Sequence, residues 1–121
     1  PYLALYNYDP DLGMLKPVPL QGFYFQTTVS FRGFKSIISV ELEEDRLVLL
    51  VAEHRASEHD IFIYHREETS QQFSLLQNFS SLDSHAASLD KDMLVVSEQN
   101  QTLIFVEDDD GNWEETLVLN Q

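Results

Sequence analysis

The chain has 121 residues, 43% of them hydrophobic, which is the size of one small domain able to bury a core. Seven Lys and Arg residues against 21 Asp and Glu residues give a formal net charge of −14. A surface this acidic repels nucleic-acid phosphates and anionic lipid heads, so neither is an expected partner. It suits cations, basic proteins or plain solvation.

Cysteine is absent, which excludes disulfides, thiolate zinc sites and cysteine nucleophiles. The longest apolar run, 47–52, is far shorter than the ~20 residues of a membrane helix, so membrane insertion is not expected. The opening "PYLALYNYDP" has neither a methionine nor a basic region and begins within an apolar alternation. We expect the chain to be a processed form or part of a longer protein.

Short runs rich in β-branched and aromatic residues predict strands almost throughout. Two strands are expected within 3–22, and 23–33 is either an elongated connection or an added strand. A short capped helix within 80–92, "SSLDSHAASLDKD", is the less favoured alternative to strands there. The remaining expected strands are 34–42, 46–53, 61–67, 72–79, 84–90, 93–98, 102–108 and 113–120.

The second half of this pattern resembles the first. "VELEEDRLVLLVAE" aligns with "ASLDKDMLVVSE", which places Leu42 on Leu89. "DIFIYHREETSQQFSLLQNF" aligns with "TLIFVEDDDGNWEETLVLNQ", which places Tyr64 on Val106, and residues 3–22 form a third, partial copy with Tyr6 at the same position. The spacing of roughly 42 to 47 residues is that of a four-stranded propeller blade.

The segment "LDSHAASLDKDMLVVSEQNQTLIFVEDDDGNWEETLVLNQ" resembles the FG-GAP-like β-propeller repeats of many secreted and surface proteins. The resemblance covers 34–121 and, less completely, 3–22. It departs from the family where the Gly-Ala-Pro step after the second strand is replaced by Ala52-Glu53 and Ser97-Glu98. It favours an extracellular or secretory-lumen location.

The resemblance implies an all-β fold of about two and a half four-stranded antiparallel blades, as a fragment of a larger ring. The corresponding units are 1–33 (two strands of a partial blade plus a connection), 34–79 (a blade) and 80–121 (a blade). Such a stack leaves an apolar face open. Further blades outside this chain are the favoured answer; association of copies and a different antiparallel sandwich are the alternatives.

The acidic segment "EDDDGNW" permits two interpretations. Asp108 and Asp110 have the spacing of calcium ligands before Gly111, but Val106 and Leu117 stand where further carboxylates are needed. We therefore favour a β-hairpin turn with no resident cofactor. In calcium-binding members of the resembled family the metal loop lies between the first and second strands, which adds Asp90 and Asp92 to the calcium candidates.

The sequence gives less support to a histidine metal site or to nucleophilic catalysis. His54 and His59 share an acidic loop but lack the spacing of a helical metal motif, and His85 beside Ser84 and Asp83 is a neighbourhood in sequence only. The function expected is a non-catalytic protein-interaction or scaffold module, with a protein partner or further blades bound by loops or edges. The alternatives are a structural accessory subunit of a large assembly and a propeller fragment of an enzyme. The residues expected at an interaction surface are Phe23, Tyr24, Phe25, Phe31 and Arg55.

Overall fold

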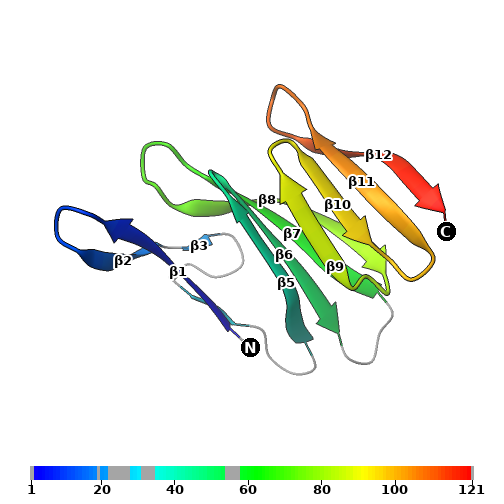
Figure 1. Ribbon diagram of the computed structural model, residues 1–121, viewed down its shortest axis with the longest axis horizontal. Helices are drawn as coiled ribbons and strands as arrows, with labels where there is room; N and C mark the ends of the chain where they lie inside the picture. Colours follow the sequence, from blue (N-terminus) through cyan, green and yellow to red (C-terminus); the bar gives the residue numbers. More distant parts are fainter. Residues whose placement is uncertain (1, 19, 22–27, 31–34, 54–57, 121) are drawn as a thin grey trace.

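The computed structural model describes residues 2–18, 20–21, 28–30, 35–53 and 58–120. Within these ranges the chain forms strands and turns and no helix, which confirms the all-β expectation (Figure 1). The strands are β1 (Tyr2–Asp9), β2 (Met14–Val18), β3 (Leu20–Gln21), β4 (Thr28–Ser30), β5 (Lys35–Glu43), β6 (Arg46–Glu53), β7 (Glu58–Arg66), β8 (Phe73–Leu82), β9 (Ala86–Asp90), β10 (Met93–Ser97), β11 (Gln101–Glu107) and β12 (Trp113–Asn120).

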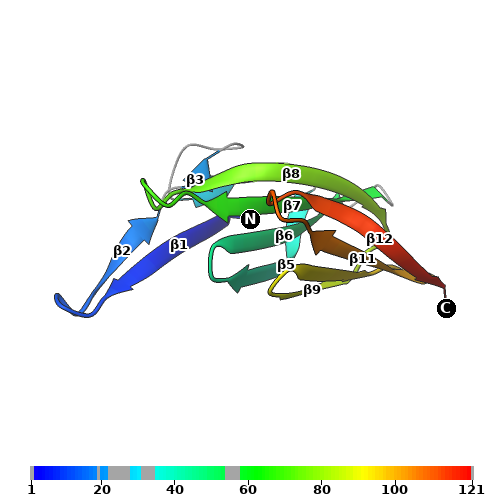
Figure 2. The ribbon, with the colours of Figure 1, turned by 90° about the horizontal axis from the view of Figure 1, so that it is seen from above.

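The described strands belong to three sheets. The first sheet has the order β2-β1-β4, the central sheet β3-β8-β7-β6-β5 and the last sheet β12-β11-β10-β9. Neighbouring strands pair antiparallel, except that the two-residue β3 runs parallel to β8. Figure 2 shows the sheets following one another along the molecule, with β1 and β2 at one end and β12 at the other. The described residues thus form an open stack, not a closed ring.

The observed bounds lie close to those expected from periodicity. β6 and β12 span the expected 46–53 and 113–120. The segment for which a short helix was the alternative forms the end of β8 and the whole of β9. Within 23–33 the structure describes β4, which pairs with β1 and so agrees with an added strand.

Two hydrophobic cores separate the three sheets, and the central sheet contributes to both. In β6 every residue from Leu47 to Val51 is at most 1% exposed, because alternate side chains point into opposite cores. The first core, between the first and central sheets, contains Leu5, Val18, Leu47, Leu49, Val51, Phe62, Tyr64 and Phe73. The second core, between the central and last sheets, contains Val48, Leu50, Ile61, Ile63, Ala87, Leu89, Leu94, Val96, Leu103, Phe105 and Trp113.

The hairpins of the central and last sheets share their registers. Leu42 pairs with Leu47 across a two-residue turn, and Leu89 pairs with Leu94 across another. The first residue of each turn, Glu44 at φ 52° and Lys91 at φ 55°, lies in the left-handed region that tight hairpin turns require. The next pairing corrects the sequence alignment: Leu47 faces Tyr64 and Leu94 faces Phe105. The counterpart of Tyr64 is therefore Phe105, one residue before the Val106 that the alignment gave.

The third and fourth strands of the two sheets match as well. Arg66 pairs with Phe73 at the start of one hairpin and Glu107 with Trp113 at the start of the other. Both ladders shift register near the middle, between Ile63 and Tyr64 and between Ile104 and Phe105. A β-bulge at the same place in both sheets bends β8 and β12 alike.

Candidate functional site

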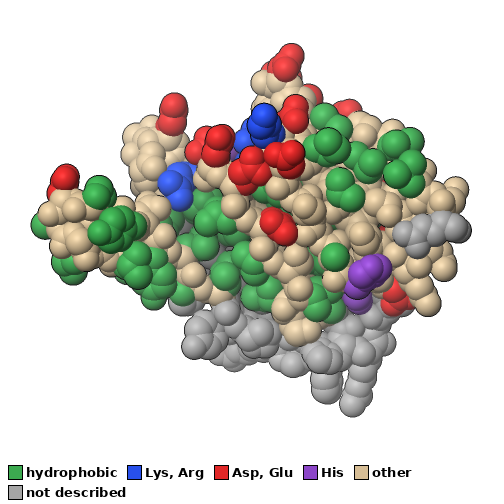
Figure 3. Space-filling view, viewed as in Figure 1, with side chains coloured by type: hydrophobic (Ala, Val, Ile, Leu, Met, Phe, Trp, Pro, Cys, Tyr) green, Lys and Arg blue, Asp and Glu red, His purple; other side chains and the backbone are tan. Residues whose placement is uncertain are grey.

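Acidic side chains gather at one edge of the molecule, where the hairpin turns of the central and last sheets lie. The turns of β5–β6, β7–β8, β9–β10 and β11–β12 lie along the upper edge of Figure 1, and Figure 3 shows carboxylates along the same edge. We call this surface the acidic rim. Its members are Glu43, Glu44, Asp45, Glu67, Glu68, Asp90, Asp92, Glu107, Asp108, Asp109 and Asp110.

An ion pair fixes two sheets together beneath the acidic rim. The Arg46 guanidinium donates from Nε to Glu107 Oε2 at 2.6 Å and from Nη2 to Glu107 Oε1 at 2.5 Å. The side chains are only 20% and 15% exposed, and the hydrogen bonds that Arg46 donates to Glu107 raise the pKa of Arg46. A second contact joins the same sheets, since the Lys91 amide donates to Glu43 Oε1 at 2.9 Å. The carboxylates of the acidic rim are thus held on a rigid double layer.

The "EDDDGNW" segment is a hairpin turn fastened by its own aspartate. Asp108 Oδ1 accepts hydrogen bonds from the amides of Asp110 and Asn112, both at 2.9 Å. Gly111 has φ 85°, a conformation that glycine adopts without steric cost. The Asp108 carboxylate therefore has a structural role in the turn, while the Asp110 side chain is exposed.

The calcium candidates do not converge. Asp90 and Asp92 are exposed on either side of Lys91 in their turn, and Asp108 and Asp110 belong to a different hairpin. Within the described ranges the structure contains no group of three or more His, Asp or Glu side chains placed to hold a metal ion.

A serine and a histidine meet at the opposite edge of the sheets. His59 Nδ1 lies 2.9 Å from the Ser84 carbonyl oxygen and 3.1 Å from Ser84 Oγ. The contact with a carbonyl requires Nδ1 to carry the proton, so this nitrogen does not act as a base toward the hydroxyl. Ser84 is 2% exposed and accepts a hydrogen bond from the Ser81 hydroxyl at 2.7 Å. This cluster fastens β7 to the β8–β9 connection.

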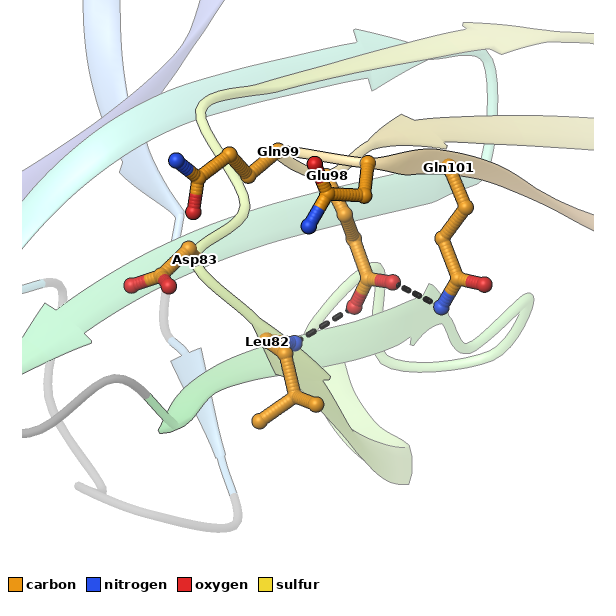
Figure 4. A pocket seen from close by; sticks show the side chains of 6 residues that line it. Leu82, Asp83, Glu98, Gln99 and Gln101 are labelled. Atoms are coloured by element: carbon orange, nitrogen blue, oxygen red, sulfur yellow. Dashed lines mark hydrogen bonds between the residues drawn. The ribbon is translucent and has the colours of Figure 1, made fainter. Parts of the chain in front are cut away.

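Beside that cluster lies a polar hollow of about 340 Å³, lined by Leu82, Asp83 and the segment 98–101 (Figure 4). At its base the Glu98 carboxylate, on a residue that is 3% exposed, accepts hydrogen bonds from the Leu82 amide and the Gln101 side chain. The hydrogen bonds offset the cost of burying this charge. Glu98 joins the end of the central sheet to the β10–β11 turn.

The expected interaction residues Phe23, Tyr24, Phe25, Phe31 and Arg55 lie outside the described residues, as does His54. Met14 and Leu15, in the same apolar part of the sequence, are 57% and 63% exposed.

Three contacts between the sheets were not anticipated from the sequence: Arg46 with Glu107, Glu98 with Leu82, and Gln77 with Trp113. The Gln77 side chain accepts from the Trp113 amide at 2.6 Å and donates to its carbonyl at 3.0 Å. A signal existed for two of them. Arg46 is a lone cation directly after three acids, and Glu98 lies in one of the two steps where the sequence departs from the expected propeller-repeat pattern.

The chain matches no family model, no curated protein and no solved structure in the three comparisons made. Among the residues that the structure describes, none belongs to a helix of the length and apolarity needed to cross a bilayer.

Proposed function

We propose that this chain is a non-catalytic protein-interaction module, built from propeller-blade-like sheets, that binds a basic protein surface with its acidic rim. The observation that carries the proposal is the gathering of carboxylates from the central and last sheets on one edge (Figure 3). Because Arg46 and Glu107 hold the two larger sheets together there, a partner meets these charges already positioned.

The blade interpretation rests on the repeated registers. Two consecutive four-stranded units, β5–β8 and β9–β12, have the same strand order, similar two-residue turns and a bulge at the same place. Their sheets stack face to face, as neighbouring blades do. Hairpin turns at one edge of such a stack vary without disturbing the cores, which suits an interaction module.

The charge of the acidic rim indicates the chemistry of the partner. Glu44, Asp92 and Asp109 are exposed and come from three different turns. A basic partner gains attraction from all of them at once, and this attraction weakens with added salt.

The test compares wild type with two triple variants of equal charge change. The rim variant E44N/D92N/D109N neutralises exposed acids on three turns, and the matched control E58Q/D83N/E115Q neutralises three exposed acids elsewhere. Proteins from source-cell extract that bind each immobilised chain are quantified by mass spectrometry at low salt and at ~0.5 M salt. We expect a basic protein on wild type and control that is lost from the rim variant and at high salt. The same proteins on all three chains contradict the proposal.

A second candidate function is a structural subunit of a larger assembly. It is supported by the exposure of Met14 and Leu15, which are 57% and 63% exposed on β2. A neighbouring subunit that covers this strand removes their apolar surface from water. Insolubility of the isolated chain, relieved by substituting Met14 and Leu15 with Ser, favours this function over the first.

A further inference from the structure

Each sheet of this stack has two different faces. Neighbouring sheets are joined by contact between one kind of face and the other. We call the face that points toward the preceding sheet the trailing face, and the face that points toward the following sheet the leading face. The trailing face of the central sheet includes Leu47, Phe62 and Tyr64, which pack in the first core. The register equates these with Leu94, Leu103 and Phe105, which form the trailing face of the last sheet and pack in the second core.

The contact between the central and last sheets shows how a leading face is covered. Val48 and Ile63 on the leading face of the central sheet are 0% exposed in the second core. Phe79, on the same face, places its ring centroid 4.8 Å from that of Phe105. The Gln77 side chain accepts a hydrogen bond from the Trp113 amide and donates one to the Trp113 carbonyl oxygen. Apolar side chains thus form this interface, together with polar contacts such as those of Gln77 and of Arg46 with Glu107.

The leading face of the last sheet carries corresponding apolar residues that no described strand covers. The register equates Val95 and Ile104 with Val48 and Ile63, and it equates Leu119 with Phe79. On this face Met93, Leu117 and Leu119 are 41%, 49% and 47% exposed.

The trailing face of the first sheet, at the other end of the molecule, is likewise covered by none of the described strands. Leu5 points into the first core. Tyr6 and Tyr8 lie one and three residues further along β1, so they point the opposite way, and they are 56% and 64% exposed. Leu15 pairs with Tyr8, lies on the same face and is 63% exposed. Tyrosine and leucine at this density are typical of a covered surface, since tyrosine is enriched in interface cores.

We propose that a second copy of this chain docks the trailing face of its first sheet onto the leading face of the last sheet, in a head-to-tail contact. The two open faces are of opposite kind, so their union repeats the arrangement that already joins the central and last sheets. In the second copy the trailing faces of the central and last sheets are covered, which leaves the first sheet as the docking face. A head-to-tail contact repeats until it closes a ring or extends a filament.

This proposal is independent of the binding of a basic partner and behaves oppositely toward salt. Both copies are strongly acidic, at a formal −14 each, so added salt screens their repulsion and strengthens self-association. Binding through the acidic rim weakens under the same change. Failure of either proposal is therefore visible without reference to the other.

The test uses sedimentation velocity of the full chain up to about 200 µM, at two salt concentrations. The leading-face variant is L117E/L119E and the trailing-face variant is Y6E/Y8E. The matched control L76E/L82E adds the same charge at Leu76 and Leu82, which are 42% and 60% exposed on β8 of the central sheet and so belong to neither open face. Thermal melting at low protein concentration verifies that each variant folds like wild type.

We expect wild type and control to associate, and each face variant alone to bind itself at least 10-fold more weakly. Mixing the two face variants restores a dimer, because one supplies an intact trailing face and the other an intact leading face. A wild type that stays monomeric at the highest concentration overturns the proposal. So does a mixture that stays monomeric, or a control that loses association as the face variants do.

Discussion

Arg46 and Glu107 bind each other through two hydrogen bonds, although 61 residues separate them in the chain. Arg46 begins β6 of the central sheet and Glu107 ends β11 of the last sheet. Their bidentate geometry is the strongest form of a carboxylate–guanidinium pair, and both side chains are largely shielded from water. The pair therefore stabilises the contact between the two sheets at the edge where the carboxylates gather.

The first prediction tests this contact by a double-mutant cycle. We expect R46M and E107Q each to lower the free energy of unfolding by about 1–3 kcal/mol, because each leaves a shielded polar partner unmatched. The double variant should lose less than the sum, with a coupling of about 1–2 kcal/mol measured by urea denaturation.

A control for this cycle is the exposed pair of Lys16 and Asp9, whose charged atoms lie 3.0 Å apart. The Lys16 side chain is 56% exposed, so solvent screens the attraction and K16M should change stability little. Additive effects of R46M and E107Q, with no coupling, contradict the structural role given to the Arg46–Glu107 pair.

The second prediction concerns Tyr64, which is 0% exposed and whose hydroxyl has no hydrogen-bond partner among the residues that the structure describes. Burying a hydroxyl without a partner costs about 1–3 kcal/mol, whereas a phenyl ring at the same place leaves the packing of the ring unchanged. We expect Y64F to match or exceed the wild-type free energy of unfolding at pH 7, by up to about 1 kcal/mol. A loss above about 1 kcal/mol in thermal or urea unfolding contradicts the unpaired hydroxyl.

The third prediction follows from the same burial, which raises the pKa of Tyr64 from 10.0 to about 12. Above pH 10 the unfolded tyrosine ionises while the folded one keeps its proton, so the unfolded state binds fewer protons. The free energy of unfolding must then fall as pH rises from about 10 to 12, by roughly 2–3 kcal/mol. Urea unfolding of Y64F and wild type across this range should show the fall reduced in Y64F. Parallel pH profiles contradict the prediction.

The strands and hairpins were predictable from sequence because they depend on local pattern. Alternation and β-branched runs give β6 and β12 their bounds, and the acidic turns interrupt them. Residues 47–52 form one continuous apolar run, which is typical of a strand buried on both faces. Val48 and Leu49, which point to opposite faces, are both 0% exposed.

Contacts between sheets could not be predicted in the same way, because they depend on register and on three-dimensional stacking. The alignment of Tyr64 with Val106 fails by one residue. A gap-free alignment cannot match both strands of the hairpin, because six residues join β7 to β8 and five join β11 to β12. A shift of one residue turns a side chain to the other face of a sheet. The partners of Arg46 and Glu98 lie in other parts of the sequence, which no local pattern connects.

The fourth prediction separates the hairpin from the calcium interpretation of Asp108 and Asp110. Asp108 Oδ1 fastens two amides of the turn, so D108A should lower the free energy of unfolding by about 1 kcal/mol. The exposed Asp110 serves as the matched control, and D110A should leave stability unchanged. Thermal melting with and without millimolar calcium decides the matter: a calcium-dependent rise in Tm that D110A abolishes contradicts the hairpin interpretation.

The fifth prediction concerns the buried carboxylate of Glu98, which accepts hydrogen bonds from the Leu82 amide and the Gln101 side chain (Figure 4). E98Q keeps one acceptor oxygen but turns an amide nitrogen toward one of these donors, so a loss of about 1–2 kcal/mol is expected. E98A removes both acceptors and should lose more.

Hydrogen exchange gives this prediction a local readout. The Leu82 amide should exchange faster in E98A than in wild type, because its acceptor is gone and the polar hollow beside it admits water. Q99A is the matched control, since Gln99 lines the same hollow but is exposed. If Leu82 exchanges equally in E98A and Q99A, Glu98 does not fasten the end of β8, and the join between the central sheet and the β10–β11 turn must rest on the second core alone.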